Sequence, residues 1–227
     1  MSKTIEHRVI AHIENDYAEK FGIPRQSGLV RELESVIVFE KEYRSPEALR
    51  GIEGYSHLWL IWQFSEAEGQ GWHPTVRPPR LGGNKRVGVF ASRSPFRPNA
   101  IGLSSVRLLG LEETRDRGTI LRVSGADLMN GTPIFDIKPY LAFTDAHVEA
   151  TGGFADDVFD HKLSVNFPQE LSQKLPQEKV SALCELLSQD PRPSYQEDPA
   201  RIYKMSFSNY TVCFRVEEDK LFVTDIL

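Results

Sequence analysis

The feature that most constrains the fold is a series of short apolar runs separated by glycines and prolines. The clearest run extends from Ser56 to Phe64 and is rich in the aromatic and branched residues that favour strands. Before residue 165, only one short helix is expected, around Pro46 to Gly51. Further strand-like runs cover residues 36–39, 86–91, 101–109, 119–123 and 134–139. Strands at this spacing, without helices between them, favour an antiparallel sheet or barrel over a doubly wound fold.

The last part of the chain has a different pattern. Val180, Leu183, Cys184 and Leu187 recur at helical spacing and predict an amphipathic helix that runs to about Ser188. Two strands joined by a turn are expected to follow, over residues 210–216 and 220–226. The predicted organisation is therefore a mainly β domain over 1–145, a linker loop over 146–165 and a small α+β domain over 166–227. An appendage of this size needs the larger domain beside it for stability.

Composition argues against several classes of protein. The longest uncharged apolar run, Leu58 to Trp62, is too short to cross a bilayer, and the first residues do not resemble a signal peptide. Two cysteines cannot form a disulfide framework, and the six histidines lack ligand spacing. We therefore expect a cytoplasmic protein with no membrane segment and no metal site. Nucleotide-binding glycine loops and hydrolase nucleophile motifs are also absent from the sequence.

Charge is distributed unevenly along the chain. The net charge is −5, yet residues 69–111 contain no Asp or Glu and seven of the 27 basic residues, which leaves 20 basic against 32 acidic residues elsewhere. The seven are Arg77, Arg80, Lys85, Arg86, Arg93, Arg97 and Arg107. Such a concentration indicates binding of phosphate or nucleic acid. The alternative is a basic surface that faces acidic partners within the fold.

Two segments carry candidate site residues. In 93–104, Pro95 and Pro98 stiffen the backbone around Arg93 and Arg97, whose guanidinium groups suit phosphate or carboxylate. In 127–140, Asp136 interrupts an apolar strand. Asp136 either forms a buried ion pair, for example with Lys138, or serves as a functional carboxylate; Asp127 is somewhat more favoured for function.

Four strings give the chain a resemblance to a known family. They are Ile23-Pro-Arg-Gln-Ser-Gly28, Arg77-Pro-Pro-Arg-Leu-Gly-Gly83, the segment Ala91 to Ser104 and the segment Asp127 to Tyr140. Together they strongly resemble the TrmO (YaeB/TsaA-like) family of S-adenosylmethionine-dependent tRNA methyltransferases, and the likeness extends over nearly the whole chain. Two departures are Ala100, in place of an expected proline, and Asn130, in place of an expected aspartate.

The resemblance implies a single-sheet antiparallel β-barrel, unlike the Rossmann type of methyltransferase. It also implies a homodimer that acts on tRNA next to the anticodon. The reaction it implies is methylation of the exocyclic amine of threonylcarbamoyladenosine at position 37. It also implies a set of cofactor contacts: Pro24, Arg25, Gln26, Phe64, Ser65, Arg93, Leu103, Ser124, Gly125, Ala126, Asp127 and Leu128. Leu103 and Leu128 are expected to sandwich the adenine.

Roles for the remaining candidates follow from the chemistry of this reaction. Asp136 and Tyr140 are candidates to accept or relay the proton of the attacked nitrogen, although its carbamoyl group can make a dedicated base unnecessary. Expected contacts to tRNA are Arg77, Arg80, Arg86 and Arg97, with Arg97 on the carboxylate of the modified base. A non-catalytic RNA-binding barrel is the main alternative, in which Trp59, Trp62 or Trp72 stacks on bases.

Overall fold

The computed structural model describes residues 4–78, 81, 85–158, 162–192 and 198–227. Their secondary structure is mainly β, as the sequence predicts. The strands are β1 (Ala11–Glu14), β2 (Glu34–Phe39), β3 (His57–Gln63), β4 (Thr75–Val76), β5 (Val87–Gly88), β6 (Ile101–Thr114), β7 (Gly118–Ser124), β8 (Pro133–Pro139), β9 (Ser164–Asn166), β10 (Tyr203–Phe207), β11 (Tyr210–Glu217) and β12 (Lys220–Ile226). The α-helices are α1 (Ala142–Asp145), α2 (Gln169–Ser172) and α3 (Gln177–Ser188).

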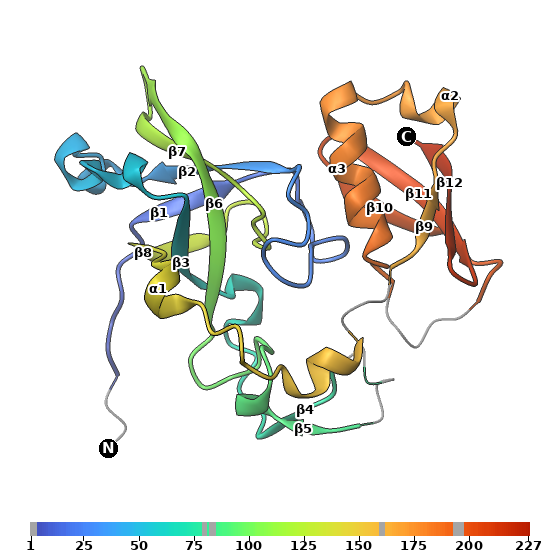
Figure 1. Cartoon of the computed structure of the whole chain (residues 1–227), viewed down its shortest axis with the longest axis horizontal. Coiled ribbons are helices and arrows are strands. Elements are labelled where there is room, and N and C mark those ends of the chain that lie inside the picture. Colours follow the sequence, from blue (N-terminus) through green and yellow to red (C-terminus); the bar gives the residue numbers. More distant parts are fainter. Residues whose placement is uncertain (1–3, 79–80, 82–84, 159–161, 193–197) are drawn as a thin grey trace.

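Six of these strands form a closed antiparallel barrel in the order β1-β2-β7-β6-β3-β8 (Figure 1). Closure comes from β8, which pairs with β3 on one side and with β1 on the other. Along β3, Leu58, Leu60 and Trp62 point inward while their neighbours are partly exposed, which is the alternation expected of a strand with one buried face. The barrel core is therefore built from the period-two pattern that the sequence shows.

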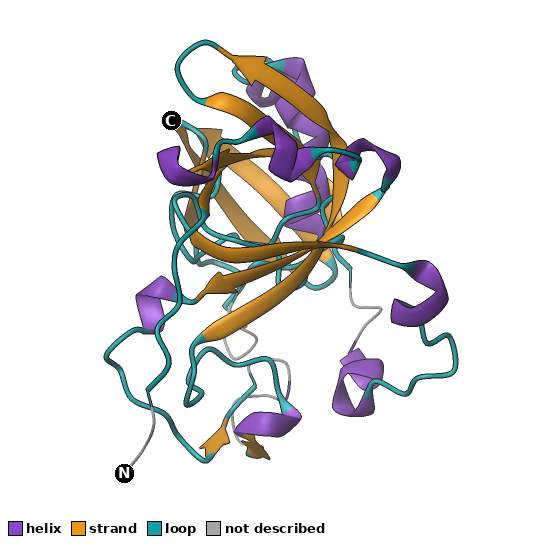
Figure 2. Ribbon diagram, turned by 90° about the vertical axis from the view of Figure 1, so that its left-hand side faces the viewer, coloured by secondary structure: helices purple, strands orange, loops and turns teal. Residues whose placement is uncertain are grey.

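Several short helical turns lie at the periphery of the barrel (Figure 2). The predicted helix around Pro46 to Gly51 is a 3₁₀ turn over Pro46–Leu49, and the predicted strand at 86–91 is wrong beyond Gly88. Residues Val89–Ala91 form another 3₁₀ turn instead, in which Val89 is buried and Phe90 is exposed. Strands β1, β4, β9 and β10 were not predicted, because they are short or lack a strong alternating pattern.

The C-terminal part folds around a second apolar core. Its sheet has the order β10-β11-β12-β9, and the predicted amphipathic helix is α3, whose buried residues include Leu183 and Leu187. Strands β11 and β12 lie where the sequence predicts them, and β9 pairs with β12 in parallel. Both cysteines of this part are free thiols; Cys213 is buried and Cys184 is partly buried. No described helix is long and apolar enough to span a membrane.

The loop between β1 and β2 connects the two cores. In Figure 1 this loop extends from the barrel toward α3. Its side chains Tyr17, Val30 and Leu33 are buried within the C-terminal core cluster rather than in the barrel. Polar contacts join the same surfaces, including an ion pair of Lys179 with Asp16 at 2.5 Å. The position of this loop is thus set by the C-terminal domain.

Candidate functional site

A large cavity of about 1270 Å³ lies where the β1–β2 loop meets one end of the barrel. Its volume exceeds the ~300–1,000 Å³ that is usual for a site of one small molecule. It therefore has room for a cofactor and part of a second substrate. The lining comes from Lys20, Tyr140 and five segments: residues 23–31, 56–67, 92–97, 101–107 and 124–132.

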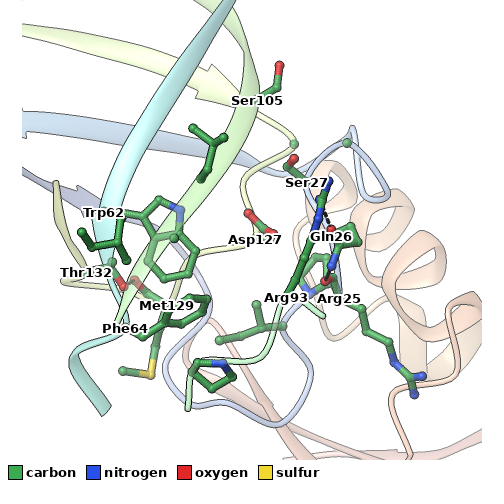
Figure 3. Close-up of a pocket in the computed structure, with 18 of the residues that line it drawn as sticks. Arg25, Gln26, Ser27, Trp62, Phe64, Arg93, Ser105, Asp127, Met129 and Thr132 are labelled. Carbon is green, nitrogen blue, oxygen red and sulfur yellow. Dashed lines mark hydrogen bonds between the residues drawn. The ribbon is translucent and has the colours of Figure 1, made fainter. Parts of the chain in front are cut away.

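The buried wall of the cavity is a chain of three hydrogen-bonded side chains. The Trp62 indole Nε1–H donates to Ser104 Oγ at 3.0 Å, and the Ser104 hydroxyl donates to Asp127 Oδ1 at 2.5 Å. Gly102 makes this arrangement possible, since a Cβ there would overlap the indole ring, at 2.6 Å from Trp62 Cδ2. Figure 3 shows Trp62 and Asp127 on this wall.

Asp127 is the carboxylate of this wall. Burial raises the pKa of Asp127 above its ordinary value, while the hydrogen bond from Ser104 and the charge of Arg93 act in the opposite direction. Among the described residues, no group of three His, Cys, Asp or Glu side chains gathers in the geometry of a metal site.

Two loops meet across the opposite side of the cavity. Arg93 Nη1 donates to Gln26 Oε1, which joins segment 92–97 to segment 23–28 (Figure 3). The Gly28 N–H donates to the Gly125 carbonyl at 2.8 Å, so the β1–β2 loop is also fixed to the end of β7. This close approach favours glycine at position 125, because a Cβ on Gly125 would lie 3.3 Å from the Gly28 backbone.

Arg25 points away from the centre of the cavity. Figure 3 shows its side chain extending toward the C-terminal domain. Its Nη2 donates to the carbonyls of Asp190 and Arg192 there, at 2.9 and 3.0 Å. A second contact of the same kind is the Glu185 carboxylate, which accepts from the Arg31 backbone N–H at 2.7 Å. Arg25 thus anchors the segment that carries Pro24 and Gln26.

We expect Arg25→Ala to lower the stability of the native fold by about 1–3 kcal/mol, because two charge-assisted hydrogen bonds between the domains are lost. Urea unfolding at neutral pH measures this difference. Arg50→Ala is the matched control, since Arg50 is exposed and pairs only locally with Glu47. Equal stability of the two variants would contradict an anchoring role.

The structure brings ten of the twelve expected cofactor residues to this cavity. They are Pro24, Arg25, Gln26, Phe64, Ser65, Arg93, Leu103, Ser124, Gly125 and Asp127. Ala126 and Leu128 do not line it, because their side chains are buried in the barrel core. Leu128 therefore cannot cover one face of an adenine, whereas Leu103 is exposed at the cavity.

Of the two candidates for proton transfer, only one lies at the cavity. Tyr140 lines the cavity, with its ring centroid 5.4 Å from that of Trp59. Asp136 does not line it; its carboxylate pairs with Lys138 Nζ at 2.8 Å and accepts from the Ile137 N–H. The structure thus favours the ion-pair alternative for Asp136, with the difference that this pair is half exposed rather than buried.

The four arginines expected to contact tRNA also have different positions. Arg97 lines the cavity, but its Nη1 donates to the carbonyls of Ser92 and Ser94 at 3.1 Å each, so it also holds its own loop in shape. Arg77 and Arg86 lie outside the cavity near β4 and β5, where Arg86 bonds Thr75. Arg80 lies outside the described residues.

Several lining residues were not predicted from the sequence. Lys20, Arg31 and Arg107 add positive charge, and Trp62, Met129 and Thr132 shape the buried wall or its edge. Ser104 does not line the cavity; it is buried behind Trp62, whose indole it binds. Arg107 belongs to the acid-free stretch, so the charge pattern could have indicated it. Trp62 gave no such signal, because it lies in an apolar strand and is indeed mostly buried.

The fold and this site define a β-barrel protein with a large cavity at one end of the barrel, beside a loop that packs on a second domain. Residues 12–146 match the family model of the tRNA-methyltransferase O N-terminal domain, and residues 160–227 match that of the TrmO C-terminal domain. The chain therefore belongs to the TrmO family, as the sequence motifs indicate.

Similar proteins agree with this assignment. A tRNA (adenine(37)-N6)-methyltransferase of Escherichia coli (strain K12) is 40% identical over 218 residues, which covers 92% of each chain. One from Eikenella corrodens is 44% identical over 174 residues, 76% of this chain and 97% of that protein. The crystal structure of TrmO from Pseudomonas aeruginosa superposes with a TM-score of 0.79 at 32% identity, over 99% of this chain and all of the other.

Proposed function

We propose that this protein transfers a methyl group from S-adenosylmethionine to the N6 atom of adenosine 37 in tRNA. The observation that carries the proposal is the cavity itself. Ten residues that the family resemblance implies for the cofactor come from segments far apart in the chain and line one space. Two relatives named for this activity are 40% and 44% identical to the chain.

The lining fits an adenosyl group with a charged amino-acid tail. Backbone groups of residues 64–65 and 124–127 would form hydrogen bonds with the edge of the adenine, and Leu103 offers an apolar surface. Arg93, already beside Gln26, can hold a carboxylate at the rim. The bound sulfonium supplies the methyl group, and the protein contributes chiefly alignment of the reacting atoms.

The opposite end of the cavity suits the RNA base. Trp59 and Tyr140 provide aromatic rings, and Arg97 and Arg107 add positive charge to the lining. We propose that the substrate adenosine carries a threonylcarbamoyl group, whose carboxylate is bound by Arg97. Because Arg97 also holds the backbone of Ser92 and Ser94, its loss would affect both substrate affinity and loop order.

The proposal extends to the oligomeric state, the domain boundaries and the contacts with tRNA phosphates. We propose a cytoplasmic homodimer in which residues 1–145 form the methyltransferase domain, 146–165 a linker and 166–227 the C-terminal domain. Three exposed apolar side chains, Phe90, Phe143 and Val148, provide apolar surface that a second copy of the chain would cover. Basic residues outside the cavity, Arg77 and Arg86 among them, would contact tRNA phosphates.

Radiolabelled S-adenosylmethionine tests the proposal. Methyl groups should enter tRNA only when protein, cofactor and tRNA are all present, and calorimetry should show stoichiometric cofactor binding in the presence of a chelator. Arg93→Ala should weaken that binding, and Arg50→Ala, at an exposed site outside this cavity, is the control. Tight tRNA binding without cofactor binding would instead identify a non-catalytic RNA-binding barrel.

A further inference from the structure

The chain of Trp62, Ser104 and Asp127 has a fixed direction of hydrogen bonding. An indole N–H can only donate, so Ser104 Oγ must accept the bond from Trp62 at 3.0 Å. The Ser104 hydroxyl hydrogen is then available for Asp127 Oδ1, 2.5 Å away. Asp127 Oδ1 is therefore an acceptor, which leaves Oδ2 as the oxygen on which a proton could be received.

The chain is held rigidly at its inner end. Ser104 is 1% exposed and Trp62 is 6% exposed, and the indole ring rests on the bare backbone of Gly102. Side chains that cannot move keep the carboxylate in one orientation toward the cavity. A flexible surface carboxylate such as that of Asp136, half exposed and paired with Lys138, has no comparable support.

Few charged or titratable groups face Asp127. Arg93 approaches from the segment 92–97, and the buried Tyr17 hydroxyl lies near enough for the Asp127 charge to raise the pKa of Tyr17. The Ser27 backbone N–H also stabilises the charged form of Asp127. Burial outweighs these effects and raises the pKa of Asp127, so its carboxylate is a stronger base than an ordinary aspartate.

We propose that Asp127 is the general base of the methyl transfer and that Ser104 and Trp62 are its positioning residues. The inference rests on the proposed function. In the balanced step, the exocyclic N–H bond breaks and its proton passes to Asp127. At the same time, the nitrogen bonds the methyl carbon, and the C–S bond breaks with its electron pair left on sulfur.

The chemistry of the nucleophile explains the need for such a base. The lone pair of an exocyclic amine is delocalised into the ring and the carbamoyl group, so the proton must leave around the time of attack. Asp127 is the only described Asp or Glu on the cavity lining besides Glu66, whose carboxylate is exposed and lies 3.8 Å from Lys20. The geometry therefore supports proton acceptance by the partly buried, oriented carboxylate of Asp127.

Titration of the indole N–H resonances tests the proposal without turnover. The Trp62 resonance, assigned with Trp62→Phe, should shift with pH at a midpoint above the ordinary aspartate value of about 3.9 and become flat in Asp127→Asn. Trp59 is an internal reference, because its indole donates to Asp145, whose pKa is lowered by the backbone N–H of Leu141 and by Trp59. Its resonance should shift at a lower pH.

Kinetics supply the second test. Asp127→Asn should reduce kcat by about 10²–10⁴-fold while the Kd for S-adenosylmethionine changes by less than about threefold. Ser104→Ala should keep the plateau rate but move the acidic limb of the pH–rate profile to higher pH, because the removed hydrogen bond favours the charged form. Asp116→Asn, in the exposed turn after β6, is the matched control and should change neither quantity.

Two results would overturn the proposal. One is an Asp127→Asn variant with the kcat of the native protein, and the other is a variant that loses cofactor affinity but not kcat, which would make Asp127 a cofactor contact. Either result leaves the proposed function intact, provided the native protein methylates tRNA. Failure of the native protein to methylate tRNA would instead contradict the proposed function itself.

Discussion

Gly102→Ala is expected to destabilise the native fold by about 1–3 kcal/mol and to abolish high-affinity binding of S-adenosylmethionine. The added Cβ would overlap the Trp62 ring, which lies in the barrel core and cannot move inward. The ring also lines the cavity, so it must shift away from Ser104 toward the cavity and take up space that the cofactor needs. Urea unfolding and calorimetric titration with the cofactor measure the two effects.

Gly88→Ala is the matched control for this change. Both glycines lack a positive φ, and a Cβ on Gly88 would meet no atom within 4 Å. Stability of Gly88→Ala should remain within about 0.5 kcal/mol of the native protein, with cofactor affinity unchanged. If Gly102→Ala behaves like Gly88→Ala, the Trp62 ring does not occupy this position in solution.

Gly22→Ala is expected to cost about 2–4 kcal/mol of stability, because two penalties combine. Gly22 has a φ of +95°, which L-residues rarely adopt, and its Cβ would overlap the side chain of Met205, at 2.6 Å from Cγ. Met205 is fully buried on β10, so it cannot swing into solvent. Chemical unfolding monitored by tryptophan fluorescence gives the loss.

Gly51→Ala separates the two penalties. Gly51 has a φ of +85° but open space around its Cβ position, so the substitution adds only backbone strain, about 1–2 kcal/mol. The excess loss in Gly22→Ala then reports the packing of the β1–β2 loop on the C-terminal sheet. Identical losses in both variants would show that this loop is not packed on β10.

Strands with a clear alternating or apolar pattern could be predicted from the sequence. The run around Leu58 to Trp62 is β3, in which every second residue is buried, and the run at 134–139 is β8, in which Ile134 is buried. The short strand β1 could not be predicted, since Ala11–Glu14 has only two inward-facing apolar positions. Its place is decided by pairing with β2 and β8.

The candidate site could be predicted only in part. Motif residues in loops, such as Gln26 and Arg93, were expected at one site, and the structure brings them together. Arg107 faces the same cavity because β6 lies beside β3, a neighbour relation that spacing along the chain does not reveal. The role of Arg25 depends on a contact with Asp190, which is 165 positions away.

The roles of Asp127 and Asp136 also could not be predicted from the sequence alone. Both follow from one motif, and spacing alone leaves each either ion-paired or functional. The fold separates them, because Ser104 reaches Asp127 from β6 while Lys138 lies two residues from Asp136 on the same strand. The partners of a carboxylate decide its role, and the partner of Asp127 is known only once the fold places β6 beside it.

The most direct test of the central claim uses two tRNAs that differ only in the threonylcarbamoyl group on adenosine 37. After reaction with S-adenosylmethionine, nucleoside mass spectrometry should locate one added methyl on N6 of the modified adenosine, with far less on the unmodified tRNA. A methyl group at another position, or no incorporation into either tRNA under conditions where the cofactor binds, would contradict the assignment.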